Sequence, residues 1–133
     1  MTIAILYIAT FVVFLGLDYI GLTQLVKPTF ERDISALLLD SPRLGPAAVF
    51  YAFYVGCVLW FVSWPALQDG RTYLWVFATA ALIGAMAYGT YEFTNLATLK
   101  GWSWRMVATD LVWGTILTGV SATAGVAVTR WMT

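Results

Sequence analysis

The chain has 133 residues, of which 61% are hydrophobic and only 11% are charged. A soluble domain typically has roughly 45–50% apolar and about 25% charged residues, so this composition argues against an ordinary soluble globule and favours a protein embedded in lipid. Seven basic residues balance seven acidic ones, and no basic run is long enough to indicate nucleic-acid binding. The absence of histidine and the single Cys57 exclude a histidine metal site, a Ser–His pair and an intramolecular disulfide.

Four apolar segments are long enough to cross a bilayer, whose hydrocarbon core of about 30 Å requires roughly 20 helical residues. We expect helices near residues 3–24, 47–67, 73–98 and 106–128. Barrel strands would be shorter and would alternate in polarity, whereas helices satisfy their own backbone groups in lipid. The first segment lacks the basic start of a signal peptide and is expected to be retained. The sequence therefore predicts an all-α four-helix membrane bundle over residues 1–133, as a single domain.

The expected helix ends coincide with proline and glycine. Lys27-Pro28 is predicted to end the first helix, and Gly45-Pro46 to open the second. Gln68-Asp69-Gly70 is a tight turn, and Lys100-Gly101 closes the third helix. Pro65, in the last turn of the second helix, is expected to bend or fray it.

The longest connection, residues 27–44, has apolar residues at helical spacing: Phe30, Ile34, Leu37 and Leu38. Charged residues lie between them, so a short amphipathic helix on the membrane surface is predicted. The alternative is a plain lid over the end of the bundle.

The distribution of Lys and Arg gives an orientation. The first and third connections, with the residues beside them, carry five basic residues, and the opposite side carries two. The five are Lys27, Arg32, Arg43, Lys100 and Arg105, and the two are Arg71 and Arg130. Because cytoplasmic loops are enriched in Lys and Arg, we expect loops 1 and 3 in the cytoplasm and both termini outside.

Aromatic and small residues predict how the helices are anchored and packed. Trp102 and Trp104 are expected to anchor the bundle at one membrane interface. At the other interface, the expected anchors are Trp64, Tyr73, Trp75 and Trp131. Small residues spaced four apart, as in Ala80/Gly84 and Ser121/Gly125, are expected at ordinary helix–helix contacts.

Three carboxylates, Asp18, Glu92 and Asp110, fall inside the predicted spans. Each costs at least ~2.5–3.5 kcal/mol at the bilayer centre, so such residues usually have a function. Asp18 lies nine residues before Lys27, Glu92 eight before Lys100 and Asp110 five after Arg105. At 1.5 Å per residue, each sits roughly 8–14 Å below the same boundary. We expect the three acids to meet at one level of the bundle.

Other polar side chains are predicted at this level. Tyr88, Glu92 and Asn95 share one helix face at i, i+4 and i+7. Trp113 lies too deep for an interfacial belt, so its indole N–H is expected to donate to a carboxylate. The full candidate ligand-binding set is Asp18, Tyr51, Tyr54, Tyr88, Tyr91, Glu92, Asn95, Asp110 and Trp113.

A cluster of acids without a buried base has three physical options. The acids are protonated, they bind a cation from outside, or Lys27, Lys100 or Arg105 reaches down to pair with them. No spacing matches a known catalytic motif, so no catalytic residue, cofactor or metal is assigned.

Three functional hypotheses remain. The first is a membrane protein that binds a small cation, a proton or a lipid-like ligand at this cluster, with a transporter as one version. The second is a membrane-embedded enzyme or accessory subunit acting on a lipid or isoprenoid, with two carboxylates as acid and base or as metal ligands. The third is a structural partner in a homo-oligomer or larger membrane complex.

Several segments together resemble a family of small bacterial predicted membrane proteins of unknown function. They are residues 88–102 (YGTYEFTNLATLKGW), 17–18 (LD), 50–51 (FY), 65–67 (PAL) and 110–115 (DLVWGT), with Thr118. The family usually has Asp where this chain has Glu92, which keeps the acid but lengthens its reach. The resemblance implies a four-helix protein of the bacterial inner membrane, and it implies no activity.

Overall fold

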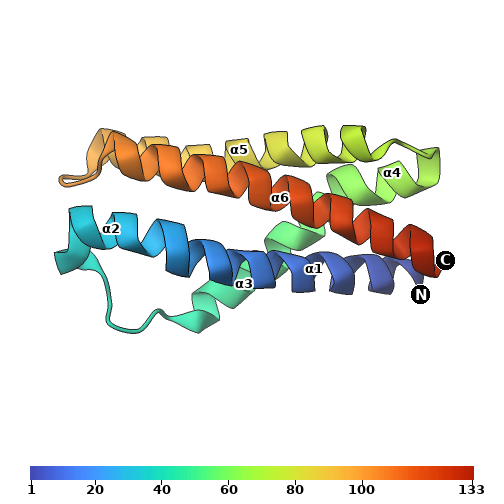
Figure 1. Ribbon diagram of the computed structural model, residues 1–133, viewed down its shortest axis with the longest axis horizontal. Helices are drawn as coiled ribbons and strands as arrows, with labels where there is room; N and C mark the ends of the chain where they lie inside the picture. Colours follow the sequence, from blue (N-terminus) through green and yellow to red (C-terminus); the bar gives the residue numbers. More distant parts are fainter.

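The computed structural model describes residues 1–133 as helices and short connections, with no strand. The elements are α1 (Thr2–Gly21), a π-helical turn (Leu22–Val26), α2 (Lys27–Ile34), a 3₁₀ turn (Ser35–Leu37), α3 (Leu44–Val58), a second π-helical turn (Leu59–Ser63), α4 (Trp64–Asp69), α5 (Tyr73–Thr98) and α6 (Trp104–Met132). They join into four rods long and apolar enough to cross a membrane (Figure 1). The predicted all-α membrane helical bundle is therefore confirmed.

Both helices that contain an internal proline continue through it. The prediction that the first helix ends at Lys27-Pro28 is wrong, since the helical chain runs from Thr2 to Leu37. Proline lacks an N–H, and its ring crowds the carbonyl four residues earlier. In each case a π-helical turn of five residues immediately precedes the short helix that carries the proline, and it absorbs this mismatch. Pro65 thus accompanies a bend between α3 and α4, visible in Figure 1, without fraying the helix.

The amphipathic segment predicted in residues 27–44 is present as α2, but it extends α1 instead of forming a separate helix. The rod Thr2–Leu37 has 36 residues. At 1.5 Å per residue it is about 54 Å long, so it exceeds a hydrocarbon core of about 30 Å. Its far end turns onto the α5–α6 connection, where Ile34 is buried beside Gly101. The segment therefore covers one end of the bundle, as the lid alternative expected.

The third and fourth predicted helices are observed with small changes. α5 has the predicted bounds, and α6 extends the predicted segment 106–128 at both ends. Side-chain caps fix both starts: Thr72 Oγ1 accepts from the Trp75 backbone N–H at 3.1 Å, and Ser103 Oγ accepts from that of Met106 at 3.2 Å. Gly70, with a φ of 67°, ends α4 in the left-handed conformation.

Small residues allow α6 to approach its neighbours closely. A Cβ on Gly84 of α5 would lie 2.6 Å from the carbonyl oxygen of Gly114 of α6. A Cβ on Gly125 of α6 would overlap the side chain of Thr10 of α1. The expected small-residue contacts are therefore present, and they set the spacing of α1, α5 and α6.

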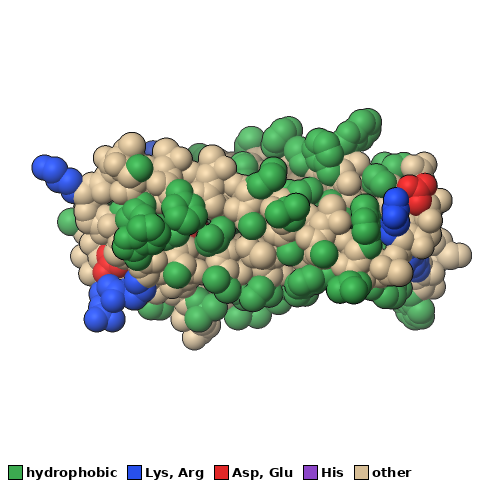
Figure 2. Space-filling model, turned by 90° about the horizontal axis from the view of Figure 1, so that it is seen from above, with side chains coloured by type: hydrophobic (Ala, Val, Ile, Leu, Met, Phe, Trp, Pro, Cys, Tyr) green, Lys and Arg blue, Asp and Glu red, His purple; other side chains and the backbone are tan.

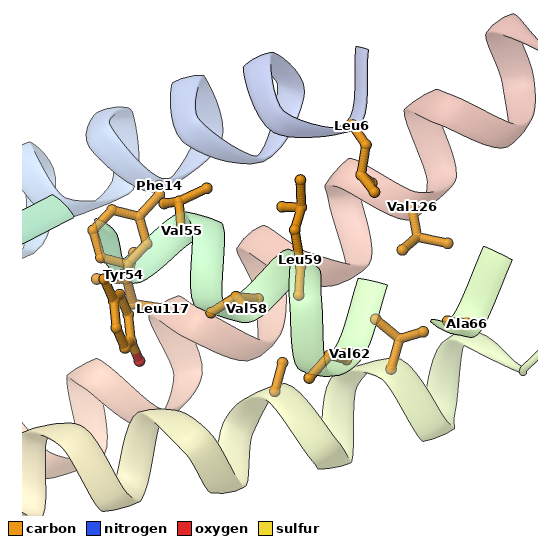
Figure 3. Close-up of a cluster of buried hydrophobic side chains, with 13 residues drawn as sticks. Leu6, Phe14, Tyr54, Val55, Val58, Leu59, Val62, Ala66, Leu117 and Val126 are labelled. Atoms are coloured by element: carbon orange, nitrogen blue, oxygen red, sulfur yellow. The ribbon is translucent and has the colours of Figure 1, made fainter. Parts of the chain in front are cut away.

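The apolar core lies where the four rods meet. It contains thirteen buried residues, among them Leu6 and Phe14 of α1 and Leu117 and Val126 of α6. In Figure 3, side chains of the α3–α4 rod lie against those of α1 and α6: Val55 is beside Phe14, and Tyr54 is beside Leu117. The core is small because most large apolar side chains point outward.

The outer surface has the polarity that a bilayer requires. Trp60, Phe61 and Phe53 are 75%, 62% and 69% exposed. Figure 2 shows hydrophobic side chains along the length of the molecule, with Lys and Arg confined to its two ends. The termini lie together at one end, and the 35–43 and 99–103 connections lie at the other (Figure 1). Loops 1 and 3 thus share a side, as the sequence predicts.

Candidate functional site

Asp18, Glu92 and Asp110 come together inside the bundle, toward the end covered by α2. Asp18 of α1 is buried, Glu92 of α5 is fully buried and Asp110 of α6 is half-buried. The Asp110 carboxyl is close enough to those of Glu92 and Asp18 for a charge interaction with each. The expected meeting of the three acids at one level is therefore observed. We call these three residues the acid cluster.

No base of the protein neutralises the acid cluster. The structure contains two ion pairs, Lys27–Glu31 at 3.7 Å and Arg105–Asp33 at 2.6 Å, and both lie at the α2 end. The Arg105 side chain therefore points away from the acid cluster and toward Asp33 of α2. The alternative in which Lys27, Lys100 or Arg105 reaches down to the acids is not the arrangement observed.

Trp102 belongs to the site, although the sequence suggested only an interfacial anchor. Its indole Nε1–H donates to Glu92 Oε1 at 3.0 Å. Gly101, with a φ of 83°, turns the chain back over the end of α5, and the Trp102 ring then packs edge-on against Phe30 and Tyr91. A tryptophan directly after this glycine, ten residues beyond Glu92, was the signal in the sequence.

Two buried polar atoms near the acids have no hydrogen-bond partner. They are Glu92 Oε2 and Trp113 Nε1. The prediction that Trp113 donates to a carboxylate is therefore wrong. Its ring instead packs over Gly21, where a Cβ would lie 2.0 Å from the ring atom Cε2. Because buried polar groups are almost always paired, this acceptor and this donor are suited to binding a proton, a water or a small ligand.

Tyr51 joins the cluster, and Tyr91 and Asn95 border it. Tyr51 of α3 lies close enough to Asp18 for the two side chains to interact. Tyr91 directly precedes Glu92 in α5, and its side chain interacts with that of Asn95, one helical turn later. Tyr91 is 46% exposed, so it stands at the edge of the site and not inside it.

Tyr54 and Tyr88 lie beside the acids but form no hydrogen bond with them. The Tyr54 hydroxyl pairs with Thr118 Oγ1 at 2.8 Å, not with a carboxyl group. The Tyr88 ring covers Gly114, where a Cβ would lie 2.2 Å from the ring. Tyr54 and Tyr88 meet edge-on, with ring centroids 6.4 Å apart. These two tyrosines form a wall of the site.

The geometry does not favour a metal centre. No group of three or more Cys, Asp or Glu side chains is arranged to hold a metal ion together. The structure has two hollows, of about 460 and 540 Å³, near the end with the termini. Neither hollow is lined by Asp18, Glu92 or Asp110. The acid cluster is therefore a group of neighbouring carboxyls, with a hydrogen bond from Trp102, with Tyr51 beside it and with no compensating positive charge.

The comparisons with known proteins agree with this membrane architecture. Residues 3–127 match the family model described as "Predicted membrane protein (DUF2177)". The match covers nearly the whole chain and includes all three residues of the acid cluster. No curated protein and no solved structure matches the chain.

Proposed function

We propose, for a chain that belongs to the DUF2177 family of predicted membrane proteins, that its acid cluster binds a proton or a small monovalent cation within the membrane. The single observation that carries the proposal is the unpaired, fully buried oxygen Oε2 of Glu92, whose carboxyl group interacts with that of Asp110 and belongs to no ion pair. A buried carboxylate without a partner is costly, so the site requires a positive or donating group.

A proton would satisfy this requirement with the atoms present. Two ionised carboxylates offer acceptors only, so Glu92 and Asp110 cannot bond to each other unless one carries a proton. One shared proton removes one negative charge and gives Glu92 Oε2 the donor it lacks. Trp102 already donates to the other oxygen, Glu92 Oε1. The pair would then be satisfied without any change in the backbone.

A small monovalent cation is the other occupant that fits. It would be held by oxygens of Glu92 and Asp110, whose carboxyl groups interact directly, and the tyrosine rings nearby would favour a positive charge. A divalent ion has less support because the acids do not converge into a ligand set. No specific observation favours the enzyme or structural-partner hypotheses. Transport would require, in addition to this binding, that the bound proton or cation is released on the opposite side of the membrane.

The proposal extends to location and orientation. We place the chain in a bacterial inner membrane, with loops 1 and 3 in the cytoplasm and both termini outside. The support is the distribution of five basic residues against two and the shared end of the two loops. Impermeant thiol labelling of intact cells, with Cys57→Ala as the background, checks this: Asp69→Cys should be labelled and Ser41→Cys should not.

The decisive experiment compares matched acid variants. Infrared titration of the protein in lipid should show a protonated carboxyl band, and Glu92→Gln or Asp110→Asn should remove it. Asp40→Asn, which changes an exposed acid in the loop, is the control and should leave the band intact.

A cation site predicts a second result. Melting temperature in detergent should rise with added Na⁺, K⁺ or a small alkylammonium ion, since an occupant at 100 times its Kd stabilises the fold by about 2.7 kcal/mol. The double variant Glu92→Gln/Asp110→Asn should abolish the rise. The absence of both the band and the rise, or their persistence in the double variant, would refute the proposal.

A further inference from the structure

The end of the molecule opposite the acid cluster has two adjoining hollows of different polarity. An apolar groove of about 540 Å³ runs between α1 and the α3–α4 rod, and Ile3, Tyr7, Gly56 and Trp60 line it. A polar hollow of about 460 Å³ lies at the end of the bundle, and Thr2, Gln68 and Arg130 line it. Trp64 lines both, so the two hollows share a wall.

Arg130 gives the polar hollow a positive charge that no acid compensates. Neither of the two ion pairs of the structure includes Arg130. Its Nη2 donates to the carbonyl oxygens of Arg71 at 2.6 Å and Ala66 at 3.3 Å, and its guanidinium lies over the Tyr73 ring at 5.0 Å. These contacts hold the side chain in place while Nη1 and Nε keep free N–H donors, which suit a phosphate group.

The groove lies at the depth that an acyl chain would occupy. Ile3 and Ile8 of α1 are about 8 Å apart along the helix axis, and Gly56 and Trp64 on the other side are about 12 Å apart. From the polar hollow, the groove therefore runs about 8–12 Å toward the bilayer centre. Gly56 leaves its floor open, because a Cβ there would meet no atom within 4 Å.

We propose that the two hollows form one binding site for a phospholipid, with the headgroup phosphate on Arg130 and one acyl chain in the α1–α3 groove. The charge complementarity selects a phosphate, and the apolar lining selects the chain. A free phosphate would use only the polar hollow, and a neutral diacylglycerol only the groove. The site is separate from the acid cluster and does not depend on the proposed function.

The test is native mass spectrometry of the full chain in detergent, titrated with phosphatidylglycerol. One molecule of this lipid should remain bound at low lipid concentration. Diacylglycerol with the same chains and soluble glycerol phosphate should each bind at least about tenfold more weakly, because each lacks one half of the contacts.

Two substitutions test the two halves independently. Arg130→Gln removes the charge and should weaken phosphatidylglycerol binding by roughly tenfold or more. Because Arg130 also bonds to backbone carbonyls, Gly56→Leu provides a second variant: it fills the groove from an open position and should weaken binding similarly. Gly16→Leu, an exposed glycine of α1 that also has open space around it, is the matched control and should bind normally.

Three results would overturn the inference. Binding that neither Arg130→Gln nor Gly56→Leu changes would mean a non-specific lipid shell. Glycerol phosphate binding as tightly as the lipid would assign a free-phosphate site. Diacylglycerol binding as tightly as phosphatidylglycerol would remove Arg130 from recognition. The variants Glu92→Gln and Asp110→Asn should bind the lipid normally, so a failure here is distinguishable from a failure of the proposed function.

Discussion

Replacing Gly84 by alanine tests whether close helix contact holds the bundle together. The added Cβ would lie 2.6 Å from the carbonyl oxygen of Gly114 and 2.8 Å from Thr118 Oγ1. The backbone oxygen cannot rotate away. Thr118 Oγ1 cannot move freely either, because it donates to Gly114 O and pairs with Tyr54, both at 2.8 Å. The helices α5 and α6 must therefore separate locally.

The expected loss of stability follows from these contacts. Overpacking by one methyl group costs about 1–3 kcal/mol, and each neutral hydrogen bond that is disturbed adds about 0.5–1.5 kcal/mol. Alanine recovers up to about 1 kcal/mol through its higher helix propensity than glycine. We therefore expect Gly84→Ala to lower the free energy of unfolding by about 1–3 kcal/mol, as the net of these terms.

The measurement is reversible unfolding in mixed micelles, with helix content followed by circular dichroism. Gly16→Ala is the control, since a Cβ at Gly16 meets no atom within 4 Å, and it should be neutral or slightly stabilising. The variant Thr118→Ala should recover only part of the loss when combined with Gly84→Ala, because it relieves the contact with Thr118 Oγ1 but keeps those with Gly114 O and with the Cβ of residue 118, at 2.9 Å. Equal stability of Gly84→Ala and Gly16→Ala would refute the close-contact reasoning.

Two further predictions concern Asp33 of α2 and Trp102, which donates to Glu92 of the acid cluster. Ser103 donates a hydrogen bond to Asp33 beyond the membrane-spanning part of α1, and this bond holds the pKa of that carboxyl below its usual value. A lowered pKa in the fold means that the stabilisation is complete above about pH 4, the ordinary pKa, and is lost as pH falls through the folded value. Melting curves between pH 6 and about pH 2 should show this loss, and Asp33→Asn should flatten it; an unchanged profile would contradict the assignment. Trp102→Phe keeps an aromatic ring but leaves Glu92 Oε1 without its donor, so it should cost about 1–3 kcal/mol by the same unfolding assay, whereas Trp104→Phe, at an exposed position, should cost almost nothing.

The sequence was sufficient for the helices because apolar length is a local property. Residues 73–98 were predicted with the bounds that the structure shows for α5. Pro28 was misjudged because a proline usually ends a helix, and only the chain's ability to widen into a π-helical turn allows α1 to continue. Nothing in the local pattern of residues 22–26 distinguishes a widened turn from an ordinary one.

Part of the candidate site was also predictable. The depth of Asp18, Glu92 and Asp110 followed from their distance to the nearest loop, because helical rise is constant. The sequence did not predict which hydrogen-bond donor pairs with which carboxyl group. Trp113, three residues from Asp110, turned out to pack on Gly21, while Trp102 in the loop reaches Glu92.

The sequence by itself determined that this protein has four membrane-spanning helices with three acids at one level, since hydropathy and helical rise belong to each segment alone. Only the tertiary structure decided that no base pairs with those acids, that Arg105 forms its ion pair with Asp33, and that one oxygen of Glu92 has no hydrogen-bond partner. The physical reason is rotation: glycine contacts between neighbouring helices set which face of each helix turns inward, and a hydrogen bond depends on that angle more than on depth along the axis.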